Sequence, residues 1–140
     1  MAFFFFGTLM DPDVLAYILD RPIGSDEVDS AELAGFRRVC AREATYPVLV
    51  PDPEARLDGV VLLRPTPRDV LRIAHFESEE YEAEWTTVHR TDGGPLQARV
   101  FLALETMSAS AEPWDLPAWA AAHKAEFLER CRTWMLDAPA

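Results

Sequence analysis

Lysine, glycine and cysteine are all scarce in this chain of 140 residues. The sequence contains a single lysine, Lys124, six glycines, and two cysteines, Cys40 and Cys131. Low-complexity and disordered chains are poor in apolar residues, whereas 49% of this sequence is hydrophobic. The composition therefore predicts an ordered chain with a sizeable core, and the length predicts a single domain over residues 1–140.

The shortage of basic residues leaves a formal net charge of −11 at pH 7. Nucleic acids and anionic membrane surfaces bind clusters of Lys and Arg, so we expect neither as a partner. No apolar run reaches the roughly 20 residues that span a bilayer, and the N-terminus lacks the basic segment and cleavage site of a signal peptide. We therefore expect a cytoplasmic protein, in which Cys40 and Cys131 are free thiols.

The motifs of several common enzyme classes are also missing. There is no G-x-S-x-G elbow, P-loop, G-x-G-x-x-G or paired C-x-x-C, which removes the usual support for α/β-hydrolase, nucleotide-binding and zinc chemistry. A Cys–His nucleophile stays open, although Cys40 and Cys131 occupy apolar periodic positions that suit buried thiols. His123 and Glu126 form only a weak metal signal, so we expect no metal and no cofactor.

Four consecutive phenylalanines, Phe3 to Phe6, stand near the N-terminus and run into Gly7-Thr8-Leu9-Met10. An unbroken apolar run predicts a strand buried on both faces, and Gly7 permits a sharp turn after it. Asp11 and Pro12 then have the residue types of an N-cap and a first helical position. A strand, a turn and a helix start this close together leave backbone N–H groups unpaired, which favours a bound anion.

The remaining elements follow from periodicity and from turn residues. We predict helices over 12–19, from the capping box at Thr66 onward, and from Asp115 onward; a loop over 107–112; and strands over 31–43, 48–50, 57–63, 84–89 and 96–104. Prolines place the strand 48–50 at an edge or at a barrel rim, and Gly59 marks a bulge or a close backbone approach. The helix from Asp115 carries His123 on its apolar face, where a core histidine is expected.

Several charged and aromatic residues have two interpretations. Arg37, Arg38 and Arg42 are interpreted as a solvated strand face, with electrostatic guidance of an anionic substrate as the alternative. Trp114 and Trp119 are interpreted as core residues, with a protein-interaction surface as the alternative.

Glu77 continues an apolar helical stripe. Val70, Ile73 and Ala74 are spaced i, i+3 and i+4, and Glu77 is the i+7 member of the series. On the core side of the helix, desolvation would raise the pKa of this carboxyl toward the range of a general base. The alternative is a residue at the end of the helix whose side chain turns out to water.

Three short motifs resemble the γ-glutamylcyclotransferase-like superfamily. Phe6-Gly7-Thr8-Leu9 is similar to its Y-G-T-L or Y-G-S-N turn, Tyr46-Pro47 to its Y-P element, and Phe76-Glu77-x-x-x-Tyr81 to its F-E-x-x-x-Y segment. The order and the intervening lengths also agree, from the first strand to the hairpin near Leu104, and the most similar branch is the AIG2-like and γ-glutamylamine cyclotransferase group. The resemblance implies an α+β fold with a small mixed, partly closed β-barrel, flanking helices and a cavity at the barrel mouth.

The resemblance also implies an activity and a set of site residues. The activity is an intramolecular acyl transfer on a small-molecule γ-glutamyl amine or peptide, which releases the amine and 5-oxoproline without a cofactor. Glu77 would be the catalytic general acid/base. The substrate-binding residues would be Phe6, Gly7, Thr8, Leu9, Met10, Tyr46 and Tyr81.

Four positions depart from the family pattern. Phe6 stands where tyrosine is usual, His75 where aspartate is common, Ser78 where glycine is common, and Ala83 where arginine often follows the tyrosine. These departures bear on the substrate more than on the fold. They leave open a second hypothesis, a non-catalytic small-molecule binding module that keeps the same cavity.

Overall fold

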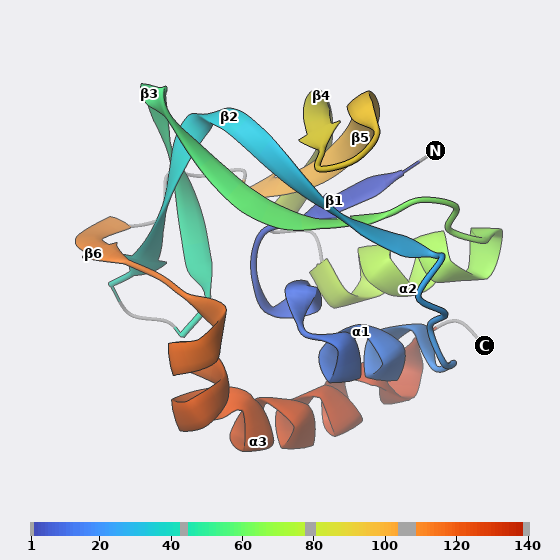
Figure 1. The fold of residues 1–140 in the computed structure, drawn as a ribbon. Helices are drawn as coiled ribbons and strands as arrows, with labels where there is room; N and C mark the ends of the chain where they lie inside the picture. The colour runs from blue at the N-terminus through green and yellow to red at the C-terminus, as the bar shows by residue number, and fades with distance from the viewer. Residues whose placement is uncertain (1, 43–44, 78–80, 104–108, 139–140) are drawn as a thin grey trace.

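The computed structural model describes residues 2–42, 45–77, 81–103 and 109–138, and it combines strands with helices (Figure 1). The strands are β1 (Phe3–Phe5), β2 (Val28–Ala41), β3 (Pro47–Leu62), β4 (Tyr81–Arg90), β5 (Gly94–Ala103) and β6 (Ala109–Pro113). The helices are α1 (Pro12–Leu19), α2 (Pro67–Glu77) and α3 (Leu116–Trp134), with short 3-10 helices η1 (Thr8–Met10) and η2 (Met135–Asp137). Within this described part, no helix has the length and apolar character needed to cross a bilayer.

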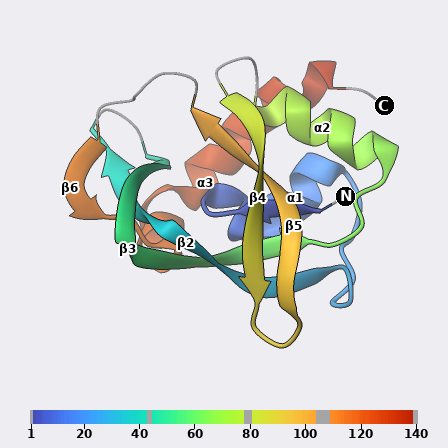
Figure 2. The same ribbon diagram turned by 90° about the horizontal axis from the view of Figure 1, so that it is seen from above.

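The strands form a mixed barrel. Their order is β3-β1-β5-β4-β2, and β2 pairs in turn with β3, so that these five strands close a ring to which β6 is added at β2. The β1–β5 pairing is parallel and the other pairings are antiparallel. The α-helices gather on one side of the strands in Figure 1, and Figure 2 views the molecule from above, with the β4–β5 hairpin in front. The predicted α+β fold with a mixed barrel and flanking helices is confirmed.

Strand β1 separates two apolar clusters. Phe3 and Phe5 belong to the cluster packed against the helices, whereas Phe4 belongs to the cluster inside the barrel. Successive side chains of a strand point to opposite faces, so a strand buried on both faces must be apolar throughout. All three residues are nearly inaccessible to solvent, which confirms the prediction of a buried strand.

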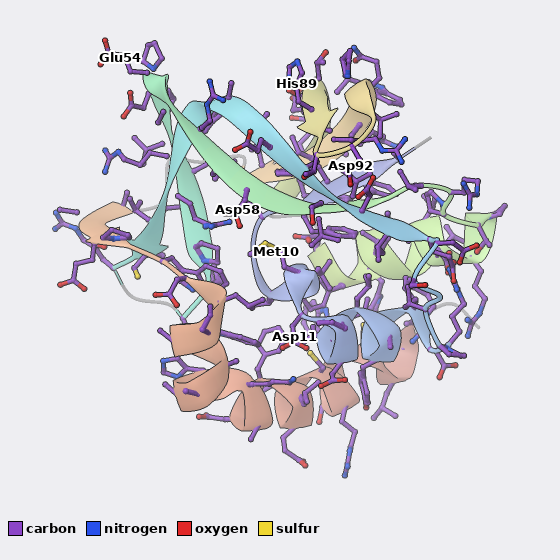
Figure 3. All side chains as sticks on the ribbon, viewed as in Figure 1. Met10, Asp11, Glu54, Asp58, His89 and Asp92 are labelled. Atoms are coloured by element: carbon purple, nitrogen blue, oxygen red, sulfur yellow. The ribbon has the colours of Figure 1, made fainter. Side chains whose placement is uncertain are left out.

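The predicted starts of the helices are confirmed by their caps. Asp11 Oδ1 accepts hydrogen bonds from Asp13 N at 2.9 Å and from Val14 N at 3.3 Å at the start of α1 (Figure 3). At the start of α2, Asp69 N donates to Thr66 Oγ1 at 3.1 Å and Thr66 N donates to Asp69 Oδ2 at 2.9 Å. This reciprocal pair is the capping box that the sequence predicted.

The prediction of separate strands over 48–50 and 57–63 is wrong, because β3 runs without a break through Pro51 and Pro53. Ala34 pairs with Arg56 and Phe36 pairs with Pro51, so the ladder with β2 is irregular between these points. A bulge of this kind tolerates a proline, since some of its N–H groups make no ladder bond. Gly35 lies opposite the irregular segment and adopts a φ of 91°, which suits a glycine.

Two further predictions are corrected near the C-terminus. Residues 109–112, expected in a loop, belong to β6, which pairs with β2 through Val39 and Ala41; the other residues of that predicted loop, 107–108, lie outside the described part. His123 is exposed on α3 instead of buried. The inward position is taken by Lys124, whose Nζ lies 3.0 Å from Asp11 Oδ2 at the start of α1.

Candidate active site

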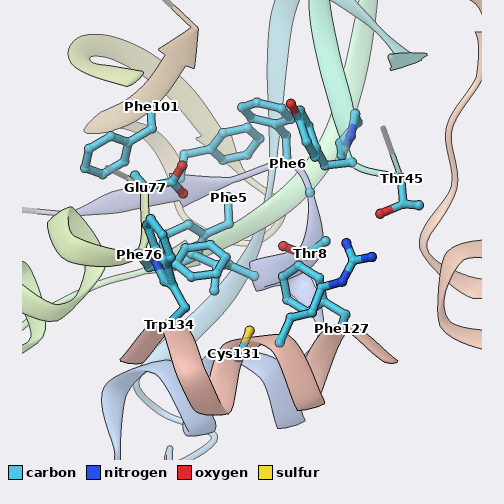
Figure 4. A pocket seen from close by; sticks show the side chains of 16 residues that line it. Phe5, Phe6, Thr8, Thr45, Phe76, Glu77, Phe101, Phe127, Cys131 and Trp134 are labelled. Atoms are coloured by element: carbon cyan, nitrogen blue, oxygen red, sulfur yellow. The ribbon is translucent and has the colours of Figure 1, made fainter. Parts of the chain in front are cut away.

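A cavity of about 750 Å³ lies where the end of β1 meets the last turn of α2 and the C-terminal half of α3 (Figure 4). Half of its lining residues are aromatic: Phe4, Phe5, Phe6, Tyr46, Phe76, Phe101, Phe127 and Trp134. Among the described lining residues, Glu77 is the only carboxylic acid and Arg130 is the only basic residue. Such a pocket, apolar with a few convergent polar groups, is typical of a small-molecule site.

The turn after β1 contributes four of its five predicted residues to this cavity. Phe6, Gly7, Thr8 and Leu9 line it, whereas Met10 does not and packs against the helical core cluster instead. The amide of Met10 donates to Gly7 O at 3.0 Å and the amide of Asp11 donates to Thr8 O at 3.1 Å. These bonds close η1, and the first amides of a helix have no partner within it.

Gly7 leaves space that a side chain would have to share with Pro47, and it does not adopt a left-handed backbone angle. Its φ is −128°, outside the left-handed region. A Cβ built on Gly7 would lie 3.1 Å from Pro47 Cγ, which is tighter than ordinary van der Waals contact. Tyr46 and Pro47, at the start of β3, also line the cavity, so two of the motifs predicted from the sequence meet in this wall.

Glu77 is the last residue of α2 and its half-buried side chain lines the cavity. Figure 4 shows its carboxylate beside the rings of Phe5, Phe76 and Phe101. Desolvation by these surroundings raises the pKa of Glu77 to about 8. The helical phase therefore directs Glu77 into the cavity, not out to bulk water.

Helix α3 supplies a wall that the sequence interpretation did not assign to the site. Phe127, Arg130, Cys131 and Trp134 line the cavity and are spaced i, i+3, i+4 and i+7, the repeat of one helix face. The apolar part of this stripe was visible in the sequence. Its spacing could not show whether the stripe faces solid core or a cavity.

Trp134 is fixed to the end of α2. Its Nε1–H donates to His75 O at 3.2 Å, and His75 Nε2 lies 2.9 Å from Trp134 O. Since a carbonyl oxygen only accepts, the second contact requires a proton on Nε2 of His75. His75 stands two residues before Glu77, so this pair of bonds holds the α3 wall against the carboxylate.

Several other candidates from the sequence take different places. Arg38 was interpreted as part of a solvated face, which is wrong, because its side chain is 13% exposed and contacts the turn. Trp114 and Trp119 are buried, as the core interpretation predicted. Ser78 and the side chain of Tyr81 lie outside the described part of the structure.

The cavity offers no strong nucleophile among its described residues. Cys131 is buried, and desolvation raises its pKa to about 11, which disfavours the reactive thiolate. In the described ranges, no group of three His, Cys, Asp or Glu side chains is arranged to hold a metal ion. The chemistry that the site can offer is acid–base work by Glu77 and recognition of charge by backbone amides and Arg130.

The chain combines a closed mixed barrel, flanking helices and one carboxylate in an aromatic cavity. Residues 3–121 match the family model described as gamma-glutamyl cyclotransferase, AIG2-like. The chain therefore belongs to this family, as the resemblance of its motifs indicated.

Individual relatives agree with this assignment. AIG2-like protein A of Arabidopsis thaliana is 30% identical over 132 residues, which cover 90% of this chain and 76% of the relative. A solution structure of a protein from Arabidopsis thaliana superposes with a TM-score of 0.68 at 27% identity, covering 96% of this chain and 89% of the other. A structure described as gamma-glutamyl cyclotransferase superposes with a TM-score of 0.57 at 13% identity, covering 94% and 86%, and this likeness concerns the fold alone.

Proposed function

We propose that the protein is a cofactor-independent γ-glutamyl cyclotransferase acting on small-molecule γ-glutamyl amines or peptides. The observation that carries this proposal is the position of Glu77, a carboxyl with a pKa of about 8, in the same cavity as the turn Phe6 to Leu9. A general acid/base works best when its pKa is close to the operating pH.

The reaction needs no nucleophile from the protein. The α-amine of the substrate attacks the carbon of its own γ-carbonyl, the bond to the departing amine breaks, and 5-oxoproline is released. Glu77 takes one proton from the α-ammonium group and returns it to the departing nitrogen. The second proton that the attacking nitrogen loses on becoming an amide N–H also passes to the released amine, which leaves as an ammonium ion, so no net proton is gained or lost by the protein. A positioned group of this kind contributes roughly 10² to 10⁴ in rate.

The turn serves to orient the substrate. The amides at the start of η1 bind the α-carboxylate of the glutamyl group, since peptide N–H groups at a helix start favour an anion. Held there, the flexible glutamyl chain is folded so that the amine meets the carbonyl, which lowers the entropic cost of cyclisation. Met10 is not needed in this arrangement, because its amide already bonds to Gly7 O.

The test is to incubate purified protein with γ-glutamyl amines and dipeptides and to measure 5-oxoproline. We expect product from the wild type, and a fall in kcat of at least about 10²-fold in Glu77→Gln. Glu84→Gln, which removes an exposed carboxylate of β4, is the matched control for the loss of one charge. Full activity in Glu77→Gln, or no product from any substrate, would refute the proposal.

The binding module is the second candidate, and the observation that favours it is Phe6, which lines the cavity where the family usually has a tyrosine. The hydroxyl of that tyrosine is missing here, and with it any hydrogen bond that it would make to a substrate. A γ-glutamyl compound that raises the melting temperature and is recovered unchanged after long incubation would support this candidate over turnover.

A further inference from the structure

The α3 wall lies beyond the part of the chain that the family model describes. The model matches residues 3–121, whereas Phe127, Arg130, Cys131 and Trp134 all follow this range. The turn and Glu77 lie inside it. The wall therefore adds to the turn and Glu77 a surface that the family model does not cover.

The aromatic rings of this wall are held in fixed positions. Phe127 makes edge contacts with Phe76 and Trp119, with ring centroids 6.1 Å and 5.2 Å apart. Trp134 is fixed by its hydrogen bonds with His75. Preformed apolar surface binds a matching apolar group without the cost of ordering the side chains on binding.

A glutamyl group would gain little binding energy from contact with such a wall. Its amine, carboxylate and carbonyl need hydrogen bonds, which phenylalanine rings cannot supply. The cavity of about 750 Å³ also falls in the range of pockets that take drug-sized ligands, well beyond the needs of one glutamyl unit. The wall therefore serves the other half of the substrate, the departing amine.

Arg130 supplies a cation on the same stripe. It stands i+3 from Phe127 and i−4 from Trp134, and side chains at these spacings on a helix are neighbours. Its Nη2 lies 3.0 Å from Glu126 Oε1, in a pair with both side chains about 70% exposed (73% and 69%). An ion pair this exposed contributes little to stability, so a better-placed carboxylate can replace Glu126 as the partner of Arg130.

Building on the proposed function, we propose that the departing amine is an amino acid with an aromatic side chain. The substrate class is then γ-glutamyl aromatic amino acids: the side chain packs against Phe127 and Trp134, and the C-terminal carboxylate pairs with Arg130. Glu77 and the turn act on the glutamyl half as described above. No step of the reaction changes.

The experiment compares four substrates that separate the contribution of the aromatic ring from that of the C-terminal carboxylate. γ-Glutamylphenylalanine has both, γ-glutamylphenethylamine has the ring alone, γ-glutamylalanine has the carboxylate alone, and γ-glutamylethylamine has neither. We expect kcat/KM to fall at least about tenfold from phenylalanine to alanine and from phenethylamine to ethylamine. This comparison uses only the wild-type protein, so folding of a variant does not enter.

The proposed pairing between Arg130 and the C-terminal carboxylate of the substrate is tested with Arg130→Gln. We expect kcat/KM to fall roughly tenfold on γ-glutamylphenylalanine and less than about twofold on γ-glutamylphenethylamine. Arg132→Gln is the matched control, since Arg132 lies on the same helix, pairs with Glu129, and does not line the cavity.

The outcomes also separate this inference from the proposed function. No 5-oxoproline from any of the four compounds would overturn both. Product formed without preference for the ring would overturn the inference and leave the cyclotransferase intact. An equal loss on both aromatic substrates in Arg130→Gln would mean that the cation pairs with the glutamyl carboxylate, which also overturns the inference.

Discussion

Arg38 donates from Nη1 to the carbonyl oxygen of Phe6 at 3.1 Å, and this bond joins β2 to the first residue of the turn. The same nitrogen donates to Asp58 O at 2.8 Å, and Nη2 donates to Asp58 Oδ1 at 3.0 Å. Met10 Sδ lies 3.8 Å from Nη1; Met10 and Asp58 are labelled in Figure 3. The guanidinium thus braces the turn against β3.

Replacing Arg38 by alanine should therefore loosen the turn. The carbonyl oxygens of Phe6 and Asp58 lose a charged donor, which should lower the free energy of unfolding by about 1–3 kcal/mol, as urea denaturation would measure. Arg37→Ala is the control, because Arg37 is 49% exposed and its ion pair within the described residues, with Asp52 at 3.7 Å, is long. This variant should change stability by less than about 0.5 kcal/mol. Equal stability of the two variants would contradict this role.

Glu77 should make the protein less stable as the pH rises. Its pKa is raised by burial from 4.5 to about 8, so between these values the folded state binds more protons than the unfolded state. The stabilisation is full below the unfolded pKa and is lost as the pH rises through 8. Glu77→Gln removes this dependence and should gain about 2–3 kcal/mol on the wild type between pH 6 and pH 9 in urea denaturation. A constant difference between the two proteins would show that the carboxyl is not desolvated.

Much of the fold was readable because local rules and tertiary structure agree. The phenylalanine run has one stable environment, a strand covered on both faces, and the capping residues at Asp11 and Thr66 make the same local bonds in any fold. The helical phase of Glu77 likewise predicts the core side, and the position of its side chain in the cavity decides against the alternative, a side chain that turns out to water. These features depend on neighbours in sequence.

The features that sequence reasoning missed depend on distant partners. Arg38 has no local signal that identifies its partners, because the carbonyl groups that it binds come from Phe6 in the turn and from Asp58 in β3. β6 is a strand only because it pairs with β2. Likewise, periodicity identifies the apolar face of α3 but cannot reveal that part of this face lines a cavity.

Gly59 should not tolerate a side chain. A Cβ built on Gly59 would lie 2.5 Å from Phe5 O and closer still to the ring of Phe4, so either β1 or the barrel core must shift. We expect Gly59→Ala to cost about 1–3 kcal/mol of unfolding free energy and to lower the melting temperature. Gly24→Ala is the control, since its Cβ would come too close only to the end of the exposed Asp26 side chain, which can move aside, and would meet Glu27 at an ordinary van der Waals distance.

The pH dependence of the reaction should distinguish Glu77 in the free protein from Glu77 beside its substrate. The base is the carboxylate, so kcat/KM should fall about tenfold per pH unit below the free pKa of about 8. In the complex, the α-ammonium group of the substrate favours the ionised carboxylate and lowers the pKa of Glu77. The acid limb of kcat should therefore lie at lower pH than that of kcat/KM. Initial rates of 5-oxoproline formation between pH 5 and 9 measure both limbs, and coincident limbs near pH 4.5 would exclude a desolvated Glu77 as the base.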